Sequence, residues 1–193
     1  AIRYKNQNIR IIFDEYEAEF IEKTDHFVVC MGMTPFTTES KKTKKQVFSA
    51  LAQKYGKNIL AVNHCCGNTS VLFDGNSMTV NFKGKLTCLL AEFAEDFQII
   101  DTNKLGSLPL VPNICEDKTA LTHKALVFGI RDYFEKHGFT KAILGLSGGI
   151  DSAVVAALTA EALGAENVMG LLMPSRFSTD HSIADAQALA DNI

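Results

Sequence analysis

Short apolar runs separated by polar turns fill the first hundred residues of the chain. Apolar runs of strand length predict β-strands at residues 9–13, 27–31, 59–63, 70–73, 77–82 and 86–90. Turns at residues 74–76 and 83–85 separate the last three strands, which predicts a β-meander. Residues 44–55 carry apolar side chains at helical spacing and precede Gly56, so a helix is expected to end there. A shorter helix is expected within residues 14–23.

After residue 117 the pattern changes to helices that alternate with strands. Helices are expected at residues 119–137, 152–163 and 182–191, and strands at residues 142–146 and 168–173. This spacing is typical of a parallel βαβ unit, so this part is predicted to be α/β, the start of a doubly wound sheet. Residues 103–117 contain two prolines and show no clear period, which predicts a linker between a domain over 1–102 and another over 118–193.

Composition and charge exclude several classes of protein. The 193 residues are 47% hydrophobic and 21% charged, which is typical of globular domains and excludes a disordered chain. A net charge of −3 offers no broad positive surface, so no nucleic-acid partner is expected. No stretch approaches the roughly 18 consecutive apolar residues that suggest a membrane helix, and the first residues do not resemble a signal peptide. We expect a cytoplasmic protein without a membrane partner.

The cysteines and the two ends of the chain add two further expectations. The five cysteines form no spaced framework and lie mostly in apolar segments, so reduced and mostly buried thiols are expected. The pair Cys65 and Cys66 beside His64 lacks the spacing of a zinc site. The first residue is not Met and the last helical pattern has no stop signal, so the chain is expected to be part of a longer protein.

Residues 145–152 read Gly-Leu-Ser-Gly-Gly-Ile-Asp-Ser and lie where the first strand of the α/β part meets its helix. Two glycines let a backbone approach a polyanion closely, and a helix start presents free N–H groups and a positive dipole end. Ser147 and Ser152 add hydroxyl donors. Asp151 would repel a phosphate unless a divalent cation lay between them, so the segment predicts a magnesium–nucleotide site.

Other motifs compete for the same residues. The run lacks the Gly-Lys-Ser/Thr ending of a Walker A loop, and its glycines do not fit a dinucleotide fingerprint. Residues 145–149 do satisfy G-x-S-x-G, the nucleophile elbow of α/β-hydrolases, which would make Ser147 a nucleophile and His181 its downstream histidine. A nucleotide-binding module without activity of its own is a further alternative.

The run from Ser147 to Ser152 resembles the SGGxDS loop of the N-type ATP pyrophosphatases, which release pyrophosphate as they adenylate a substrate. Residues 125–133 and 173–178 on either side of it are similar to the glutamine-dependent NAD synthetases. Residues 63–77 resemble the late strands of the nitrilase-type glutaminase domain in these enzymes, and 33–36 resemble the S-P-F turn beside its glutamine pocket. GMP synthetase and RNA-thiolating enzymes share the loop, but the nitrilase-like region argues against them.

The resemblance implies the fold, the reaction and the roles of residues. It implies an α/β fold in which a fragment of a nitrilase-like α-β-β-α sandwich precedes a doubly wound parallel sheet of the adenine nucleotide alpha hydrolase-like type. The implied enzyme is a carbon–nitrogen ligase that amidates deamido-NAD to NAD through an adenylated intermediate, with ammonia from glutamine or from solution, and that assembles as a homo-oligomer. Asp151 would bind Mg. The implied ATP-binding residues are Gly145, Leu146, Ser147, Gly148, Gly149, Ile150, Asp151, Ser152, Met173 and Arg176.

The glutaminase half departs from the family pattern. The family uses a Glu, a Lys and a Cys nucleophile, and none of the three is found, so no catalytic residue is assigned. Asp14 occupies the expected position of the nucleophile, and a carboxylate cannot form the usual thioester. Ser40 or Lys41 stands where the family has a basic residue in the glutamine pocket. An Ile-Cys-Glu-Asp run at residues 114–117 lies in the predicted linker and is interpreted as a coincidence.

Overall fold

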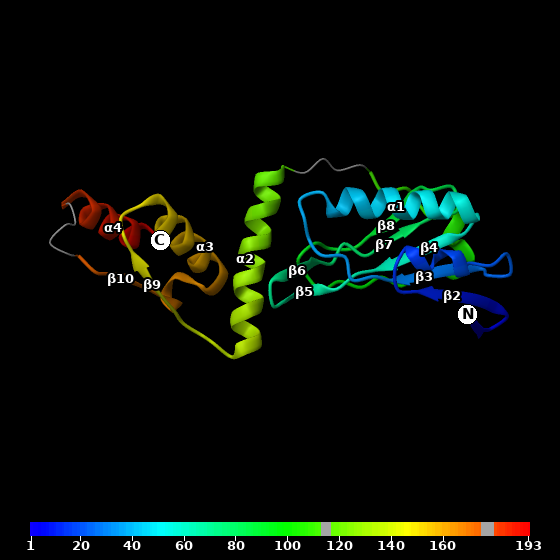
Figure 1. The fold of residues 1–193 in the computed structure, drawn as a ribbon, viewed down its shortest axis with the longest axis horizontal. Helices are drawn as coiled ribbons and strands as arrows, with labels where there is room; N and C mark the ends of the chain where they lie inside the picture. Colours follow the sequence, from blue (N-terminus) through cyan, green and yellow to red (C-terminus); the bar gives the residue numbers. More distant parts are fainter. Residues whose placement is uncertain (113–116, 175–179) are drawn as a thin grey trace. The chain divides into compact units, whose positions relative to one another are not determined.

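The computed structural model describes residues 1–112, 117–174 and 180–193. The chain divides into two compact units, Ala1–Lys118 and Thr119–Ile193 (Figure 1). Both units combine helices with parallel strands, which confirms the predicted mixed α/β class. The Ile-Cys-Glu-Asp run of the sequence lies largely outside the described residues.

A six-stranded sheet forms the first unit. Its order is β1-β2-β3-β4-β7-β8. The strands are β1 Ile2–Tyr4, β2 Gln7–Ile12, β3 Phe27–Met31, β4 Asn58–Val62, β7 Met78–Val80 and β8 Leu86–Leu89. The strands β2, β3 and β4 are parallel, so their carboxyl ends meet at one edge, and the remaining pairs are antiparallel.

One helix covers a face of this sheet. The helix α1, Ser40–Tyr55, lies along the sheet in Figure 1 and ends at Gly56, whose φ of +64° gives the left-handed cap that glycine favours. Phe48 and Ala52 of α1 pack on alternate residues of the central strands, among them Val28 and Ile59. Phe27, on the opposite face of β3, is also buried, so this strand is a continuous apolar run, which is the pattern that predicted it.

Part of the predicted meander is wrong. The strand β6, Val71–Asp74, does not join the main sheet but pairs with β5, Cys65–Asn68, in a separate two-stranded hairpin. Of the three strands of the predicted meander, β7 and β8 are the two that pair as antiparallel neighbours within the main sheet. Cys65 and Cys66 lie in this hairpin rather than in the core, and both are half-buried. Cys88 is also half-buried, whereas Cys30 is buried. The prediction of mostly buried thiols is therefore wrong for the described cysteines, although these four are free thiols.

Two irregular segments complete the first unit. The short helix expected within residues 14–23 is a 3₁₀ helix, Tyr16–Phe20. A second 3₁₀ helix, Thr102–Ser107, buries Leu105, and the backbone N–H of Val111 donates to the carbonyl oxygen of Leu86 at 3.0 Å. The first part of the predicted linker thus packs on the first unit, because it carries apolar side chains at irregular spacing.

The second unit contains the predicted βαβ arrangement. Its elements are α2 Lys118–His137, β9 Ala142–Leu146, α3 Ile150–Leu163, β10 Val168–Leu172 and α4 Asp180–Asn192, and α2 begins one residue before the unit boundary. The strands β9 and β10 are parallel and in register from Ala142 opposite Val168 to Leu146 opposite Leu172. Leu146, Ala156 and Ala186 form the centre of its core. No helix in the described parts of the chain is both long and apolar enough to cross a membrane.

Candidate functional site

The glycine-rich segment lies between β9 and α3. β9 ends at Leu146 and α3 begins at Ile150, so Ser147, Gly148 and Gly149 form the turn between them. Gly148 has a φ of +78°, a left-handed conformation that glycine adopts without a steric penalty. Gly149 is the N-cap residue of α3 and provides no side chain to cap it. The first N–H groups of a 14-residue helix therefore point into this turn, as in anion sites at helix starts.

Two serine hydroxyls brace the turn from within. Ser152 Oγ accepts a hydrogen bond from the N–H of Ser147 at 3.2 Å and donates one to the carbonyl oxygen of Gly149 at 2.9 Å. Ser147 Oγ accepts one from the N–H of Gly149 at 3.2 Å and lies 3.1 Å from Ser152 Oγ. Since Ser152 has a single hydroxyl hydrogen, which Gly149 takes, Ser147 is the donor between the two hydroxyls. A phosphate oxygen can accept a hydrogen bond from the hydroxyl of Ser147, whereas the hydroxyl of Ser152 holds the conformation of the turn.

Asp151 is an exposed acidic residue in the first turn of α3. A carboxylate at this position favours the positive end of the helix dipole, but it repels a phosphate unless a cation lies between them. Among the described residues, no group of three or more His, Cys, Asp or Glu side chains could hold a metal ion. Magnesium is commonly held by one or two carboxylates together with water and substrate phosphates. Asp151 therefore fits a magnesium ion that arrives with a nucleotide.

Met173, which follows the end of β10, also lies near the glycine-rich segment. Leu172 lies opposite Leu146 and packs against the core cluster of the second unit. Met173 is 70% exposed, and its Cε lies 3.2 Å from the position that a Cβ on Gly145 would occupy. The structure thus brings Met173 to the first glycine of the loop. Arg176, the remaining predicted residue, lies outside the described residues.

The surroundings of Ser147 differ from those of a hydrolase nucleophile. In a nucleophile elbow the serine itself occupies the strained turn, whereas here the left-handed conformation falls on Gly148. The hydroxyl of Ser147 is engaged with Ser152, and no histidine in the described part of the chain is hydrogen-bonded to it. His181 is exposed near the start of α4. This geometry favours a hydrogen-bond donor over a nucleophile.

In the first unit, Asp14 lies just after β2, at the edge where the parallel strands end. Its Oδ1 accepts hydrogen bonds from the N–H groups of Tyr16 at 2.9 Å and Glu17 at 3.0 Å. The side chain of Glu17 in turn accepts one from the N–H of Phe13 at 2.7 Å. The carboxylate of Asp14 therefore holds the first turn of the 3₁₀ helix, which is a structural role.

Cys30, on β3, is the buried thiol of this sheet, with 1% of its surface exposed. Burial raises the pKa of the Cys30 thiol to about 12, and the carboxylates of Glu15 and Asp14 add to the rise. The thiolate is the nucleophilic form of cysteine. Cys30 is therefore protonated at neutral pH and is unsuited to attack a glutamine amide.

The two candidates for the basic residue of a glutamine pocket point to other partners. Ser40 is buried, and its hydroxyl donates to Asp74 Oδ2 at 3.2 Å. The ammonium group of Lys41 lies 3.6 Å from Glu92 Oε1. Ser40 thus belongs to a buried polar network, and Lys41 forms an ion pair with an acidic side chain of the same unit.

The centre of that network is Asp74. Its Oδ1 accepts from Lys44 Nζ at 2.8 Å and from Asn63 Nδ2 at 3.0 Å, and its Oδ2 accepts from Asn76 Nδ2 at 3.0 Å. Burial lowers the pKa of Lys44, although the nearby carboxylate of Asp74 opposes that change. The network fixes the start of α1 to the end of β6.

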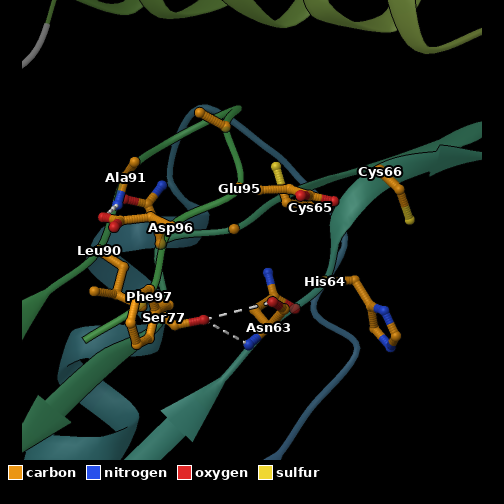
Figure 2. Close-up of a pocket in the computed structure, with 13 residues that line it drawn as sticks. Asn63, His64, Cys65, Cys66, Ser77, Leu90, Ala91, Glu95, Asp96 and Phe97 are labelled. Atoms are coloured by element: carbon orange, nitrogen blue, oxygen red, sulfur yellow. Dashed lines mark hydrogen bonds between the residues drawn. The ribbon is translucent and has the colours of Figure 1, made fainter. Parts of the chain in front are cut away.

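A cleft of about 620 Å³ opens beside the network, and the sequence did not indicate it. Figure 2 shows Asn63 and Ser77 on its floor, where the N–H of Asn63 donates to Ser77 Oγ at 3.0 Å. The segment 90–97 forms another wall, in which Asp96 accepts from the N–H of Ala91 at 2.9 Å. His64, Cys65 and Cys66 also line it, but they do not form a metal site in the described residues. Only the fold brings residues 63–66 and 90–97 together, so no local sequence signal could have found the cleft.

Comparisons with known proteins extend over both units. Residues 122–193 match the family model of NAD synthase. The chain is 41% identical over 184 residues to the glutamine-dependent NAD(+) synthetase of Synechocystis sp., covering 91% of this chain and 32% of that protein. It is 30% identical to the enzyme of the same name from Thermotoga maritima, covering 87% of this chain and 35% of that protein. The chain is similar to glutamine-dependent NAD(+) synthetases over most of its length.

This similarity confirms the family resemblance and the prediction of an enzyme family. The chain spans about one third of the length of the curated relatives that it matches. Among solved structures, a glutamine-dependent NAD+ synthetase from Acinetobacter baumannii in complex with adenosine diphosphate matches with a TM-score of 0.87 and 28% identity, over 99% of this chain and 38% of that one. A glutamine-dependent NAD(+) synthetase from Cytophaga hutchinsonii matches with a TM-score of 0.79 at 19% identity, which supports the fold alone.

Proposed function

We propose that this chain is part of an enzyme that amidates deamido-NAD to NAD at the expense of ATP. The observation that carries the proposal is the turn between β9 and α3, whose helix N–H groups, serine hydroxyls and single carboxylate suit a magnesium–nucleotide. The turn lies within the residues that match the NAD synthase model. The adenosine diphosphate held by the relative from Acinetobacter baumannii supports an adenine nucleotide as the ligand.

The residues in and beside the turn have separate roles in this proposal. The N–H groups at the start of α3 and the hydroxyl of Ser147 hold the phosphates of ATP, together with the backbone of the glycine-rich turn. Met173 would lie against the adenine, and Arg176, which lies outside the described residues, is assigned to the phosphates by the family resemblance alone. Asp151 holds the magnesium ion, which when bound neutralises part of the phosphate charge.

The reaction consists of two displacements. An oxygen of the nicotinate carboxylate attacks the α-phosphorus of ATP, and the bond to the β-phosphate oxygen breaks, so pyrophosphate leaves. Ammonia then attacks the activated carbonyl carbon, loses a proton, and displaces AMP together with the former carboxylate oxygen. Donors fixed around the leaving pyrophosphate stabilise its charge without a protein nucleophile. Ser147 therefore acts as a donor.

The source of ammonia is glutamine or the solution. The first unit corresponds to part of a glutaminase in this proposal, yet Asp14 is engaged in backbone hydrogen bonds and Cys30 is buried with a raised pKa. Neither residue suits the formation of a thioester from glutamine. Glutamine and the solution therefore both stay open as sources of ammonia in this proposal.

An isotope experiment tests the chemistry directly. Deamido-NAD labelled with ¹⁸O in the nicotinate carboxylate is incubated with the complete protein, ATP, magnesium and ammonium, and AMP is analysed by mass spectrometry. Transfer of one labelled oxygen to AMP is expected, because AMP leaves with an oxygen of the carboxylate. Formation of NAD with unlabelled AMP would refute the adenylated intermediate. Binding of ATP with no pyrophosphate release would support a nucleotide-binding module instead.

A further inference from the structure

The backbone of α4 lies directly against the glycine-rich turn. A Cβ atom on Gly148 would lie 2.2 Å from the carbonyl oxygen of Ser182 and 2.7 Å from its Cα. Ser182 is in the first turn of α4, Asp180–Asn192. No side chain fits between these two segments, so Gly148 is required there by the packing of a helix as well as by its left-handed φ.

A second contact joins the same helix to the strand that leads into the turn. Ala186 is 1% exposed and packs in one core cluster with Leu146 and Ala156. Ser182 and Ala186 are one helical turn apart and therefore share a face of α4. Gly148, which Ser182 approaches, and Leu146, which shares the core cluster of Ala186, are the two residues that flank Ser147. The helix thus holds the chain on both sides of the predicted phosphate donor.

The two glycines of the turn differ in their surroundings. Among the described residues, a Cβ on Gly149 would have Ser147 Oγ, at 3.3 Å, as its nearest neighbour beyond the adjacent residues, and no described atom of α4 would lie within 4 Å of it. In the described part of the chain, no element packs against Gly149 as α4 packs against Gly148, which leaves room for a ligand beside Gly149. The sequence alone treated both glycines as a means of close approach to a polyanion, and the structure separates their roles.

We infer that α4 is a clamp that sets the conformation of the nucleotide loop, with Ser182 and Ala186 as its positioning residues. Packed interiors transmit small displacements because they contain little free volume. A shift of α4 therefore displaces Leu146 and Gly148 and, with them, the N–H and hydroxyl donors of Ser147. Such displacements weaken binding of a ligand that requires several donors at once. The inference rests on the proposed function, since it takes a magnesium–nucleotide as that ligand.

The test changes the size of residue 186 in the complete protein. Ala186→Val adds two methyl groups at the buried contact, and Ala184→Val adds them at an exposed position of the same helix as a matched control. Ala186→Ser is the conservative variant. For each protein we would measure the dissociation constant of Mg–ATP by calorimetry, and the amide hydrogen exchange of residues 146–152 without nucleotide.

We expect Ala186→Val to weaken Mg–ATP binding about tenfold and to speed exchange in the loop by a similar factor. Ala184→Val and Ala186→Ser are expected to match the wild type in both measurements. A lower melting temperature of Ala186→Val with unchanged Mg–ATP affinity and unchanged loop exchange would overturn the inference, because it would reveal a purely structural role.

Two further outcomes distinguish a failure of the clamp inference from a failure of the proposed function. If Ala186→Val does not fold, Ala186→Gly removes the contact instead, and Ala184→Gly controls for the lower helix propensity of glycine. The same loosening of the loop is expected of Ala186→Gly alone. If the wild type binds no Mg–ATP, the proposed function fails, whereas the exchange measurement still supports or overturns the clamp.

Discussion

Lys44 and Asp74 form a buried ion pair that joins α1 to the β5–β6 hairpin. Lys44 Nζ lies 2.8 Å from Asp74 Oδ1, and only 4% and 2% of the two side chains are exposed. The hydroxyl of Ser40 and the amides of Asn63 and Asn76 complete the hydrogen bonds of the carboxylate. A buried charge is tolerated when it is paired and hydrogen-bonded in this way.

Removing one partner of this pair is expected to destabilise the first unit strongly. Lys44→Met leaves the carboxylate of Asp74 buried without its counter-charge, at a cost of about 3–5 kcal/mol in the free energy of unfolding. Urea denaturation measures the change. Lys42→Met makes the same substitution at an exposed position of α1 and is expected to change the free energy by less than about 0.5 kcal/mol. Equal effects of the two variants would contradict a special role of the pair.

The acidic side chain of the loop is expected to act through magnesium. Asp151→Asn removes a negative charge, so ATP without magnesium should bind as well or better, whereas Mg–ATP should bind more weakly. The loss of a metal contact worth several kcal/mol corresponds to about 100-fold or more in kcat/KM. Calorimetry with and without magnesium, combined with pyrophosphate release, separates the two effects. Unchanged activity of Asp151→Asn would exclude this residue as a metal ligand.

Ser147 and Ser152 are expected to differ although they are hydrogen-bonded to each other. Ser152→Ala removes the bonds to the N–H of Ser147 and the carbonyl oxygen of Gly149, so it should weaken nucleotide binding about tenfold by loosening the turn. Ser152→Thr keeps the hydroxyl and should restore most of the affinity. Ser147→Ala should lower kcat more than it raises KM for ATP, because its donor serves the leaving phosphate. Steady-state kinetics of the three variants would separate the effects on kcat from the effects on KM for ATP. A failure of Ser152→Thr to restore binding would contradict the role of the Ser152 hydroxyl in holding the turn.

Cys30 is expected to make stability fall at alkaline pH. The folded chain keeps this thiol protonated up to a pKa of about 12, whereas an unfolded thiol titrates near 9.0. The stability that the protonated thiol contributes is therefore complete below about pH 9 and is lost as the pH rises toward 12. Urea midpoints measured between pH 8 and 10.5 should fall more steeply for the wild type than for Cys30→Ala. Parallel pH profiles would show that the thiol is not held protonated.

The spacing of apolar residues predicted those strands and helices whose apolar side chains are buried. The strands Phe27–Met31 and Ala142–Leu146 have the predicted bounds, because each is a continuous apolar run. The helix Ser40–Tyr55 ends at Gly56 as expected, because the left-handed cap requires a residue such as glycine. The start of that helix was predicted too late, since its first turn is polar and Ser40 and Lys44 are buried through hydrogen bonds rather than apolar contact.

Long-range pairing accounts for what the sequence did not predict. The strand Cys65–Asn68 reads Cys-Cys-Gly-Asn, which has weak β-propensity, and it forms because it pairs with Val71–Asp74. The contact of Gly148 with Ser182 likewise joins a turn to a helix that lies beyond another helix and a strand. Local patterns locate the loop and its chemistry, but the elements that hold it in place follow from the fold.

The measurement that tests the central proposal most directly is NAD formation by the complete protein with deamido-NAD, ATP, magnesium and ammonium. A parallel reaction contains glutamine in place of ammonium. We expect NAD with ammonium, together with one pyrophosphate and one AMP for each NAD formed, and the glutamine reaction then measures what the first unit contributes. A folded protein that forms no NAD with ammonium would contradict the proposal that the loop at residues 145–152 serves an NAD synthetase.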